Sequence, residues 1–241
     1  MTVLTLRAEA LLLDMDGTLV HSTTEVETVW RLWCQSHRLD PEPVLAMCHG
    51  VRSREVIRAL APQLDLAREV ALLDELEIQH AEVAEAVAGA SAVLAALAPD
   101  RWALVTSASQ RVARHRLASA GLPLPLPRLL IGAEDVVRGK PDPEPYLLAA
   151  RQLGLAPADC LVFEDAPAGI RSALQAGCPV VQIGGDSRLD PAVVAVIPDW
   201  RQVTVVAKEA GPLLVTLPTR EAGNKKPPVS EGLSGRDPGT I

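Results

Sequence analysis

Short apolar runs separated by amphipathic segments predict alternating strands and helices over much of this chain. Residues 10–13 are all apolar and end at the polar, turn-forming residues 14–18, which predicts a buried strand followed by a loop. Four further apolar runs are predicted as strands: residues 102–106, 129–131, 161–164 and 180–183. Helical patterns occupy residues 110–120, 144–153 and 168–176, and each ends at a glycine. This alternation predicts an α/β fold with a doubly wound parallel sheet.

Residues 22–88 interrupt the alternation, because their pattern is helical. The segment from Ser22 to Glu25 predicts a capping box, after which Val26, Val29, Trp30 and Trp33 fall on one helical face. Further helices are predicted at residues 41–47, 54–60 and 66–87. We therefore predict a helical cap of residues 22–88 inserted into a core of residues 1–21 and 89–217. Because ligands of parallel sheets bind beyond the carboxyl ends of the strands, this insert would cover the site.

The C-terminal part of the chain has a different pattern. Residues 203–207 and 213–216 are apolar and flank a turn-forming segment, which predicts a β-hairpin. Residues 218–241 are rich in Pro, Gly, Ser and charged side chains. That composition predicts a disordered tail.

Composition and charge narrow the class of function. A chain of 241 residues with 48% hydrophobic content can bury a large core, which is expected to be aliphatic because aromatic residues are scarce. The net charge of −7 would not attract nucleic acid or an anionic membrane. The N-terminal segment lacks the features of a signal peptide, and no apolar stretch reaches the ~20 residues that span a bilayer. We expect a cytoplasmic protein with a small-molecule partner, and the oligomeric state is not predicted.

The four cysteines, Cys34, Cys48, Cys160 and Cys178, lie far apart in the sequence, without a CxxC pair or nearby histidines. A zinc site or a disulfide framework is therefore not expected. We predict that the thiols are small buried hydrophobic groups.

Polar residues that could carry chemistry occur in four places along the predicted core. The clusters are Asp14 and Asp16, Thr106 and Ser107, Lys140, and Glu164 with Asp165. An isolated D-x-D-G segment is often only a turn. A doubly wound sheet, however, would bring all four clusters to one edge, which favours a functional site.

The chemistry of these clusters is complementary. One carboxylate can attack phosphorus, and a second carboxyl can protonate the leaving oxygen and later activate water. A carboxylate at ~4 Å from a phosphate charge is repelled by about 4 kcal/mol at an effective dielectric constant of about 20, so cations are needed. Asp14 and Asp165 offer the hard oxygen ligands that Mg²⁺ prefers. Lys140 adds a positive charge, and Thr106 or Ser107 adds a hydroxyl donor.

With these motifs, about residues 10–217 resemble the haloacid dehalogenase superfamily. The motifs occur in order as DMDGTLV from Asp14, VTS ending at Ser107, KPDP from Lys140, and VFED ending at Asp165 and followed by APAG. The resemblance implies that Asp14 is the nucleophile and Asp16 the acid and base. It also implies that Thr106 or Ser107, together with Lys140, binds phosphate. It further implies an Mg²⁺ ion held by Asp14, the main-chain carbonyl of Asp16, and Asp165. Glu164 would contact these ligands and not the ion itself.

The helical insert and residues 49–54 resemble the cap of sugar-phosphate and glycerol-phosphate phosphatases. Arg52 or Arg54, and also His49, are candidates for contacting the substrate, although all three are also compatible with a purely structural role at a helix start. Trp30 and Trp33 are expected in the core of the cap. The predicted function is Mg²⁺-dependent hydrolysis of sugar or polyol phosphates through an aspartyl-phosphate.

Three other functions are considered. A hexose-phosphate mutase shares the core and much of the cap, but mutases resembling this type carry a histidine ten residues beyond the second aspartate, where this chain has Val26. True dehalogenases need neither a metal nor a second aspartate, so Asp16 argues against them. A non-catalytic binding protein with the same fold would be expected to have lost a motif, and none is lost.

Overall fold

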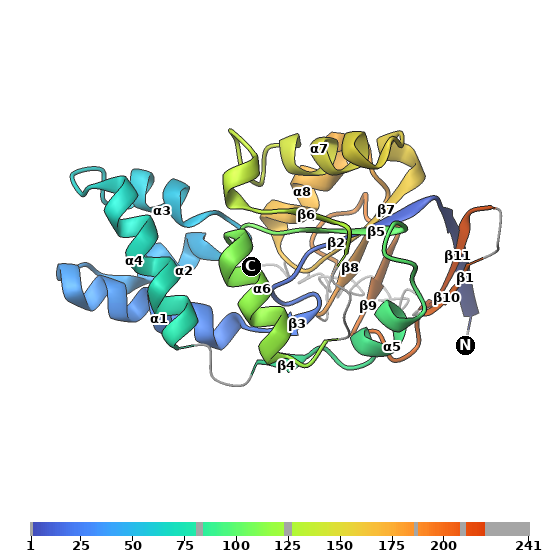
Figure 1. Ribbon diagram of the computed structural model, residues 1–241, viewed down its shortest axis with the longest axis horizontal. Helices are drawn as coiled ribbons and strands as arrows, with labels where there is room; N and C mark the ends of the chain where they lie inside the picture. Colours follow the sequence, from blue (N-terminus) through green and yellow to red (C-terminus); the bar gives the residue numbers. More distant parts are fainter. Residues whose placement is uncertain (1, 81–83, 123–126, 186–187, 208–210, 220–241) are drawn as a thin grey trace, which may run out of the picture.

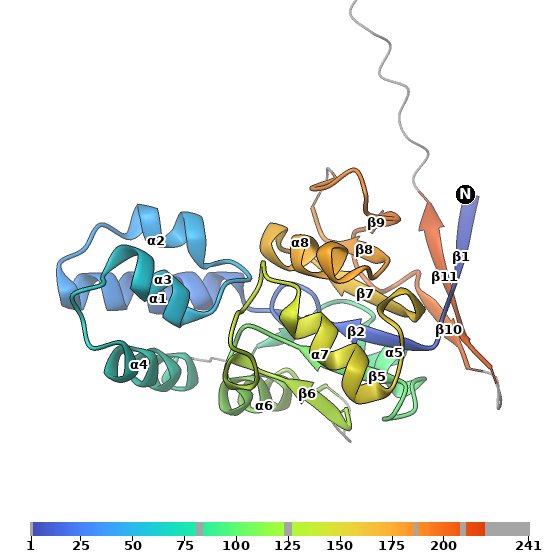
Figure 2. The ribbon, with the colours of Figure 1, turned by 90° about the horizontal axis from the view of Figure 1, so that it is seen from above.

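The computed structural model consists of a body built on a parallel sheet and a group of four helices beside it (Figures 1 and 2). It describes residues 2–80, 84–122, 127–185, 188–207 and 211–219. The four helices are inserted after the first strand of the large sheet.

The large sheet has six parallel strands in the order β6–β5–β2–β7–β8–β9. These strands are β2 (Ala10–Leu13), β5 (Trp102–Val105), β6 (Leu129–Ile131), β7 (Cys160–Glu164), β8 (Val180–Ile183) and β9 (Ala195–Ile197). The strands β2, β5, β7 and β8 are buried at every position, as expected for a parallel sheet covered on both faces. Five of the six strands were predicted, and β9 was missed.

Helices cover the two faces of this sheet. On one face α5 (Ala90–Ala95) and α6 (Gln110–Ser119) contribute to the larger core cluster, with Val93 and Leu117. On the other face α7 (Glu144–Leu153) and α8 (Pro167–Ala176) contribute Tyr146 and Ile170 to a second cluster. Two short 3₁₀ helices, Ala133–Asp135 and Pro157–Asp159, lie in the connections. The doubly wound α/β prediction is therefore confirmed.

The inserted helices have a hydrophobic core of their own. They are α1 (Thr23–His37), α2 (Pro41–Cys48), α3 (Ser53–Leu60) and α4 (Leu66–Gln79). Trp30 and Trp33 are buried in this cluster, as predicted. The antiparallel strands β3 (Val20–His21) and β4 (Glu85–Ala86) connect the insert to the sheet body at both ends.

Two details of the predicted insert are wrong. The predicted helix at residues 66–87 is too long, because α4 ends at Gln79 and Glu85 already belongs to β4. The predicted capping box does not form either. The Ser22 side chain makes no capping hydrogen bond and instead donates to Oδ1 of Asp16 at 2.5 Å.

A three-stranded sheet of order β1–β11–β10 completes the body. The predicted hairpin is confirmed, because β10 (Thr204–Val206) pairs antiparallel with β11 (Leu213–Thr219). Strand β1 (Thr2–Ala8) also pairs with β11 and was missed, although Leu4, Leu6 and Ala8 alternate as in a strand. Strand β11 includes the first two residues of the predicted tail, so the tail does not begin at residue 218. Residues 220–241 lie outside the described part of the chain.

The four cysteines are free and buried, in agreement with the prediction. Within the described residues, no helix combines the length and the apolar character needed to cross a membrane.

Candidate active site

The ends of three neighbouring strands gather the predicted polar clusters. Asp14 follows β2, Thr106 follows β5, and Glu164 is the last residue of β7. Because β5, β2 and β7 are adjacent and parallel, their carboxyl ends lie side by side. The predicted convergence at one edge of the sheet is confirmed, and the same edge faces the inserted helices (Figure 2).

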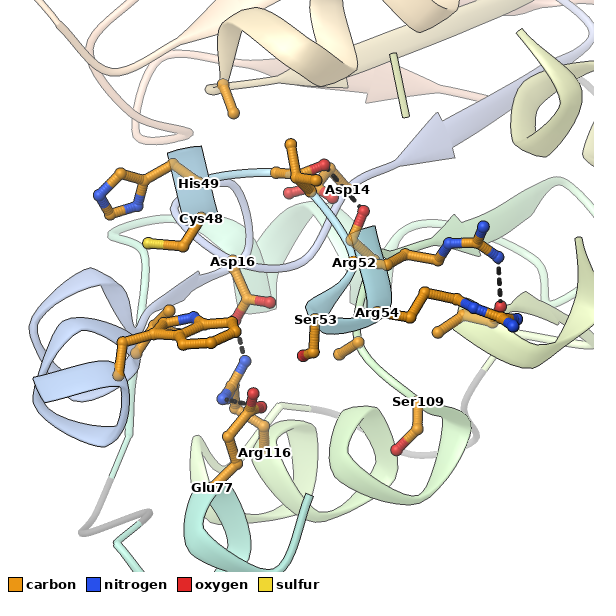
Figure 3. A pocket seen from close by; sticks show the side chains of 18 of the residues that line it. Asp14, Asp16, Cys48, His49, Arg52, Ser53, Arg54, Glu77, Ser109 and Arg116 are labelled. Carbon is orange, nitrogen blue, oxygen red and sulfur yellow. Dashed lines mark hydrogen bonds and ion pairs between the residues drawn. The ribbon is translucent and has the colours of Figure 1, made fainter. Parts of the chain in front are cut away.

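One pocket contains residues from both parts of the molecule (Figure 3). From the sheet body it is lined by Asp14, Asp16, Ser107 and Asp165, among others. From the inserted helices it is lined by residues that include His49, Arg52 and Arg54. The helices therefore form one wall of the pocket into which the strand ends open.

Lys140 connects the ends of the three strands from a buried position. Its Nζ donates to Oδ1 of Asp14 at 2.6 Å, to Oε1 of Glu164 at 2.6 Å and to the carbonyl oxygen of Val105 at 2.9 Å. The side chain is only 1% exposed. Burial alone would lower its pKa, but the two carboxylates outweigh burial and raise the pKa of Lys140. Lys140 therefore carries a fixed positive charge at Asp14.

The oxygens of Glu164 are already engaged by other groups of the protein. Oε1 accepts from Lys140 and, at 2.8 Å, from the hydroxyl of Tyr146. Oε2 accepts from the backbone N–H groups of Asp165 and Ala166. Helix α8 approaches so closely that a Cβ at Gly169 would lie 1.6 Å from Oε1. Glu164 is thus placed to orient Lys140 and the loop after β7.

Three carboxylates crowd around a single lysine. One oxygen each from Asp14, Glu164 and Asp165 lies within 4.8 Å of the others. Burial and then Glu164 raise the pKa of Asp14 from 3.8 to about 8, although Lys140 opposes the shift. Burial, Asp14 and Glu164 likewise raise the pKa of Asp165 well above its ordinary value. One lysine therefore does not supply enough positive charge to balance three ionised carboxylates.

The missing positive charge fits next to Asp165. Its Oδ1 is buried and has no hydrogen-bond partner in the described part of the chain. A buried carboxylate oxygen without a donor is costly unless a cation takes the place of the donor. The loop of Asp14 comes close here, because Gly17 has φ +78° and a Cβ on it would lie 1.9 Å from Oδ2 of Asp165. The donor set of carboxylates fits a hard divalent cation.

Asp16 is held differently from Asp14. Its Oδ1 accepts hydrogen bonds from Ser22 and from Nη1 of Arg116, which lies on α6. Nη2 of Arg116 donates to Oε2 of Glu77, on the inserted helix α4, at 2.9 Å. Figure 3 shows Asp16 and Glu77 joined through Arg116. Burial raises the pKa of Glu77 to about 7, although Arg116 opposes the shift.

The two predicted hydroxyl residues have different surroundings. Ser107 lines the pocket, and its hydroxyl donates to the carbonyl oxygen of Gly50 at 2.8 Å. This bond joins the sheet body to the inserted helices. The hydroxyl of Thr106 is buried and accepts from the backbone N–H of Ala108 at 3.1 Å. Ser107 is therefore the hydroxyl better placed to reach a bound group.

The three predicted residues of the insert also differ. Arg52 is buried, and its guanidinium donates to Glu55 and to three backbone carbonyls of residues 133, 136 and 137. Arg54 lines the pocket with a buried Nε that has no partner among the described residues. Nε2 of His49 lies 3.2 Å from Oε1 of Glu27. Arg52 thus fastens the insert to the sheet body, whereas Arg54 retains a free donor.

Sequence reasoning missed Arg116, Glu77 and Tyr146. Arg116 and Glu77 lie among other charged residues of amphipathic helices, so no local pattern marks them. Tyr146 is the single tyrosine of the chain, which is a weak signal of a particular role. Only the packing of α4, α6 and α7 around the strand ends brings these side chains to the site.

Comparison with known proteins matches this chain to one family of hydrolases and to phosphatases. The sequence model of the hydrolase family described as haloacid dehalogenase-like hydrolase matches residues 8–177. Hexitol phosphatase A of Escherichia coli is 42% identical over 87% of this chain and 100% of its own length. Glycerol-1-phosphate phosphohydrolase 2 of Saccharomyces cerevisiae is 33% identical over 78% of this chain and 79% of its own.

A solved structure has the same fold. The β-phosphoglucomutase of Clostridium difficile superposes with a TM-score of 0.70, over 80% of this chain and 92% of its own. At 18% identity this likeness concerns the fold alone.

Proposed function

This chain belongs to the haloacid dehalogenase-like hydrolase family, and from that premise we propose that it is a phosphatase of small phosphorylated sugars or polyols. The observation that carries the proposal is the joining of Asp14 to Lys140 at the end of the central strand, beside Asp165 and below a helical wall. Relatives along most of the chain are named hexitol, 2-deoxyglucose-6-phosphate and glycerol-1-phosphate phosphatases. A polyol or sugar phosphate is the substrate class that they share.

In the proposed reaction an oxygen of Asp14 attacks the phosphorus of the bound ester. The new O–P bond forms as the bond to the leaving oxygen breaks, and Asp16 gives its proton to that oxygen. Asp16, now a carboxylate, takes a proton from water as the water oxygen attacks the same phosphorus and the bond between phosphorus and Asp14 breaks. The products are an alcohol and inorganic phosphate, and Asp14 is restored. Lys140 offsets negative charge next to the reacting oxygens. Ser107 would turn its hydroxyl from the carbonyl of Gly50 to donate to the phosphate.

We propose Mg²⁺ as the cation of the carboxylate cluster. Asp14 and Asp165 would hold it through their carboxylates and Asp16 through its main-chain carbonyl. Glu164 is excluded as a direct ligand in this proposal because its oxygens are already engaged. When bound, Mg²⁺ supplies positive charge that draws a phosphate dianion towards Asp14 and lowers the repulsion between them.

The proposed cap is the group of helices α1–α4, within residues 22–88, and the proposed core is residues 1–21 and 89–217. The separate hydrophobic cluster of α1–α4 supports this division, although Ala84 and Val87 pack in a cluster of the sheet body. The cap would select the part of the substrate that is not phosphate. Arg54 is favoured over Arg52 for this role by its free, buried Nε, and His49 remains a second candidate. The cytoplasmic location stays a prediction.

Replacing Arg54 by alanine is expected to lower kcat/KM for the preferred sugar or polyol phosphate by about 10- to 100-fold, the range of one or two charge-assisted hydrogen bonds. Hydrolysis of p-nitrophenyl phosphate should change by less than about threefold, because its leaving group offers no hydroxyls to Arg54. Steady-state kinetics on both substrates measure the difference. Arg58→Ala, on the same helix but exposed and outside this pocket, is the matched control. An equal loss on both substrates would remove Arg54 from substrate selection.

The mutase alternative has a specific structural obstacle. Val26, at the place where mutases resembling this type carry a histidine, lines the pocket and cannot handle a proton. A mutase must also protect the phosphorylated aspartate from water until a second hydroxyl arrives.

Inorganic phosphate is therefore expected to accumulate in step with the loss of substrate, without a bisphosphate activator. Phosphate release and ³¹P NMR of the same reaction test this. An isomerised sugar phosphate as the main product, with little free phosphate, would establish a mutase instead.

A further inference from the structure

The ion pairs around Arg116 join three parts of the molecule at one buried point. The side chain of Arg116 is 4% exposed, and that of Glu77 is 11% exposed. Arg116 comes from α6 of the core, Glu77 from α4 of the cap, and Asp16 from the loop after the central strand. An arginine can serve two carboxylates in this way because its guanidinium presents several N–H donors in a rigid plane.

The two oxygens of Asp16 are not equivalent in this arrangement. Ser22 and Arg116 both donate to Oδ1. In the described part of the chain Oδ2 has no hydrogen-bond partner, and the side chain of Asp16 is 31% exposed and lines the pocket. Two donors on one oxygen fix the rotation of the carboxyl group. The other oxygen has no such anchor, and it belongs to a side chain that lines the pocket.

We propose that Arg116 is a positioning residue for the proton transfers of Asp16, and that Glu77 of the cap holds Arg116 in place. Oδ1 of Asp16 is the anchored oxygen. Oδ2 is the oxygen that gives a proton to the leaving alcohol and later takes one from water. This inference rests on the proposed phosphatase function and assigns two residues that the sequence motifs do not contain.

Glu77 links the position of the cap helix α4 to the orientation of Asp16. Without Glu77, the bond to Asp16 would be the only one from a described residue to hold the guanidinium, and Asp16 would lose part of its orientation. A precise orientation matters because a misplacement of about 1 Å can cost roughly 100-fold in rate. The position of the cap helix α4 therefore contributes to the acid and base chemistry, in addition to closing the pocket.

A comparison of two leaving groups separates this role from a general loss of structure. The first irreversible step, measured by kcat/KM, needs a proton donor for an alcohol but hardly for p-nitrophenolate. For Arg116→Met, kcat/KM for glycerol 1-phosphate, or for the alkyl phosphate that the wild type hydrolyses fastest, should fall at least ~10-fold more than kcat/KM for p-nitrophenyl phosphate. Arg116→Lys should lie between this variant and the wild type, because lysine keeps the charge but not the planar fork.

Two further variants complete the test. Glu77→Gln removes one charge and should shift the same ratio in the same direction, by about threefold, even if Arg116→Met does not fold. Glu75→Gln is the matched control, because Glu75 pairs with Arg111 across the same two helices but at the surface and away from Asp16. It should leave the ratio unchanged.

The outcomes distinguish this inference from the proposed function. Equal losses on both substrates in Arg116→Lys and Glu77→Gln would show that the ion pairs are only structural and would overturn the inference. A shift of the ratio in Glu75→Gln as large as that in Glu77→Gln would overturn it as well. A wild-type protein that hydrolyses neither substrate would overturn the proposed function itself.

Discussion

Replacement of Asp14 by asparagine is expected to lower kcat by about 10⁴-fold or more, the scale seen when an enzyme loses its nucleophile. A neutral amide is a poor nucleophile and a poor metal ligand, so both proposed roles of Asp14 are lost together. The fold should persist, because Lys140 keeps its bonds to Glu164 and to the carbonyl of Val105. Phosphate release and thermal unfolding of the purified variant measure the two effects.

The same substitution should also affect stability. Burial raises the pKa of Asp14 to about 8, which means that the ionised carboxylate is destabilised in the metal-free protein. The melting temperature of Asp14→Asn without metal should therefore equal or exceed that of the wild type. Asp14→Ala, measured in parallel, controls for slow deamidation of the asparagine. Activity above a few per cent of the wild-type rate in both variants would remove Asp14 as nucleophile.

Removal of Mg²⁺ is expected to stop turnover completely. Without a cation, Asp14, Glu164 and Asp165 face one lysine, and a phosphate dianion would add to the repulsion. Calcium should not restore activity, because it takes more ligands at longer distances and would misplace the phosphoryl group. The assay is phosphate release after dialysis against EDTA, followed by addition of each metal. Full activity in EDTA, with metal content shown to be negligible, would contradict the proposed site.

Metal binding should also show a defined pH dependence without any assay of turnover. In the metal-free protein the pKa of Asp14 is about 8, against an ordinary value of 3.8. Between these two values the folded state binds more protons than the unfolded state, so its stability falls as the pH rises. The proposed Mg²⁺ would bind the ionised carboxylates and would offset this loss. The increase in melting temperature on adding Mg²⁺ should therefore be larger at about pH 8 than at about pH 6. An increase that is independent of pH would argue against Asp14 as a ligand.

Several features of the fold could be predicted because they depend on local pattern. A fully buried parallel strand must be apolar along its whole length, so β2, β5, β7 and β8 are visible as short apolar runs. The edge strands β1 and β9 were missed. The prediction of helix beyond Gln79 was also wrong, because helical periodicity does not show where a chain leaves the helix to pair as β4.

The sequence by itself determined the alternating α/β order, the helical insert, the acidic residues Asp14, Asp16 and Asp165 that follow strands, and Lys140 in the connection before α7. These follow from residue type and spacing, which act over a few neighbours. Only the tertiary structure decided that Arg52 fastens the inserted helices while Arg54 keeps a donor without a partner among the described residues. It alone brought Arg116 and Glu77 to Asp16. The physical reason is that the partners of a long charged side chain are set by helix packing between segments far apart in the chain, and local periodicity does not encode that packing.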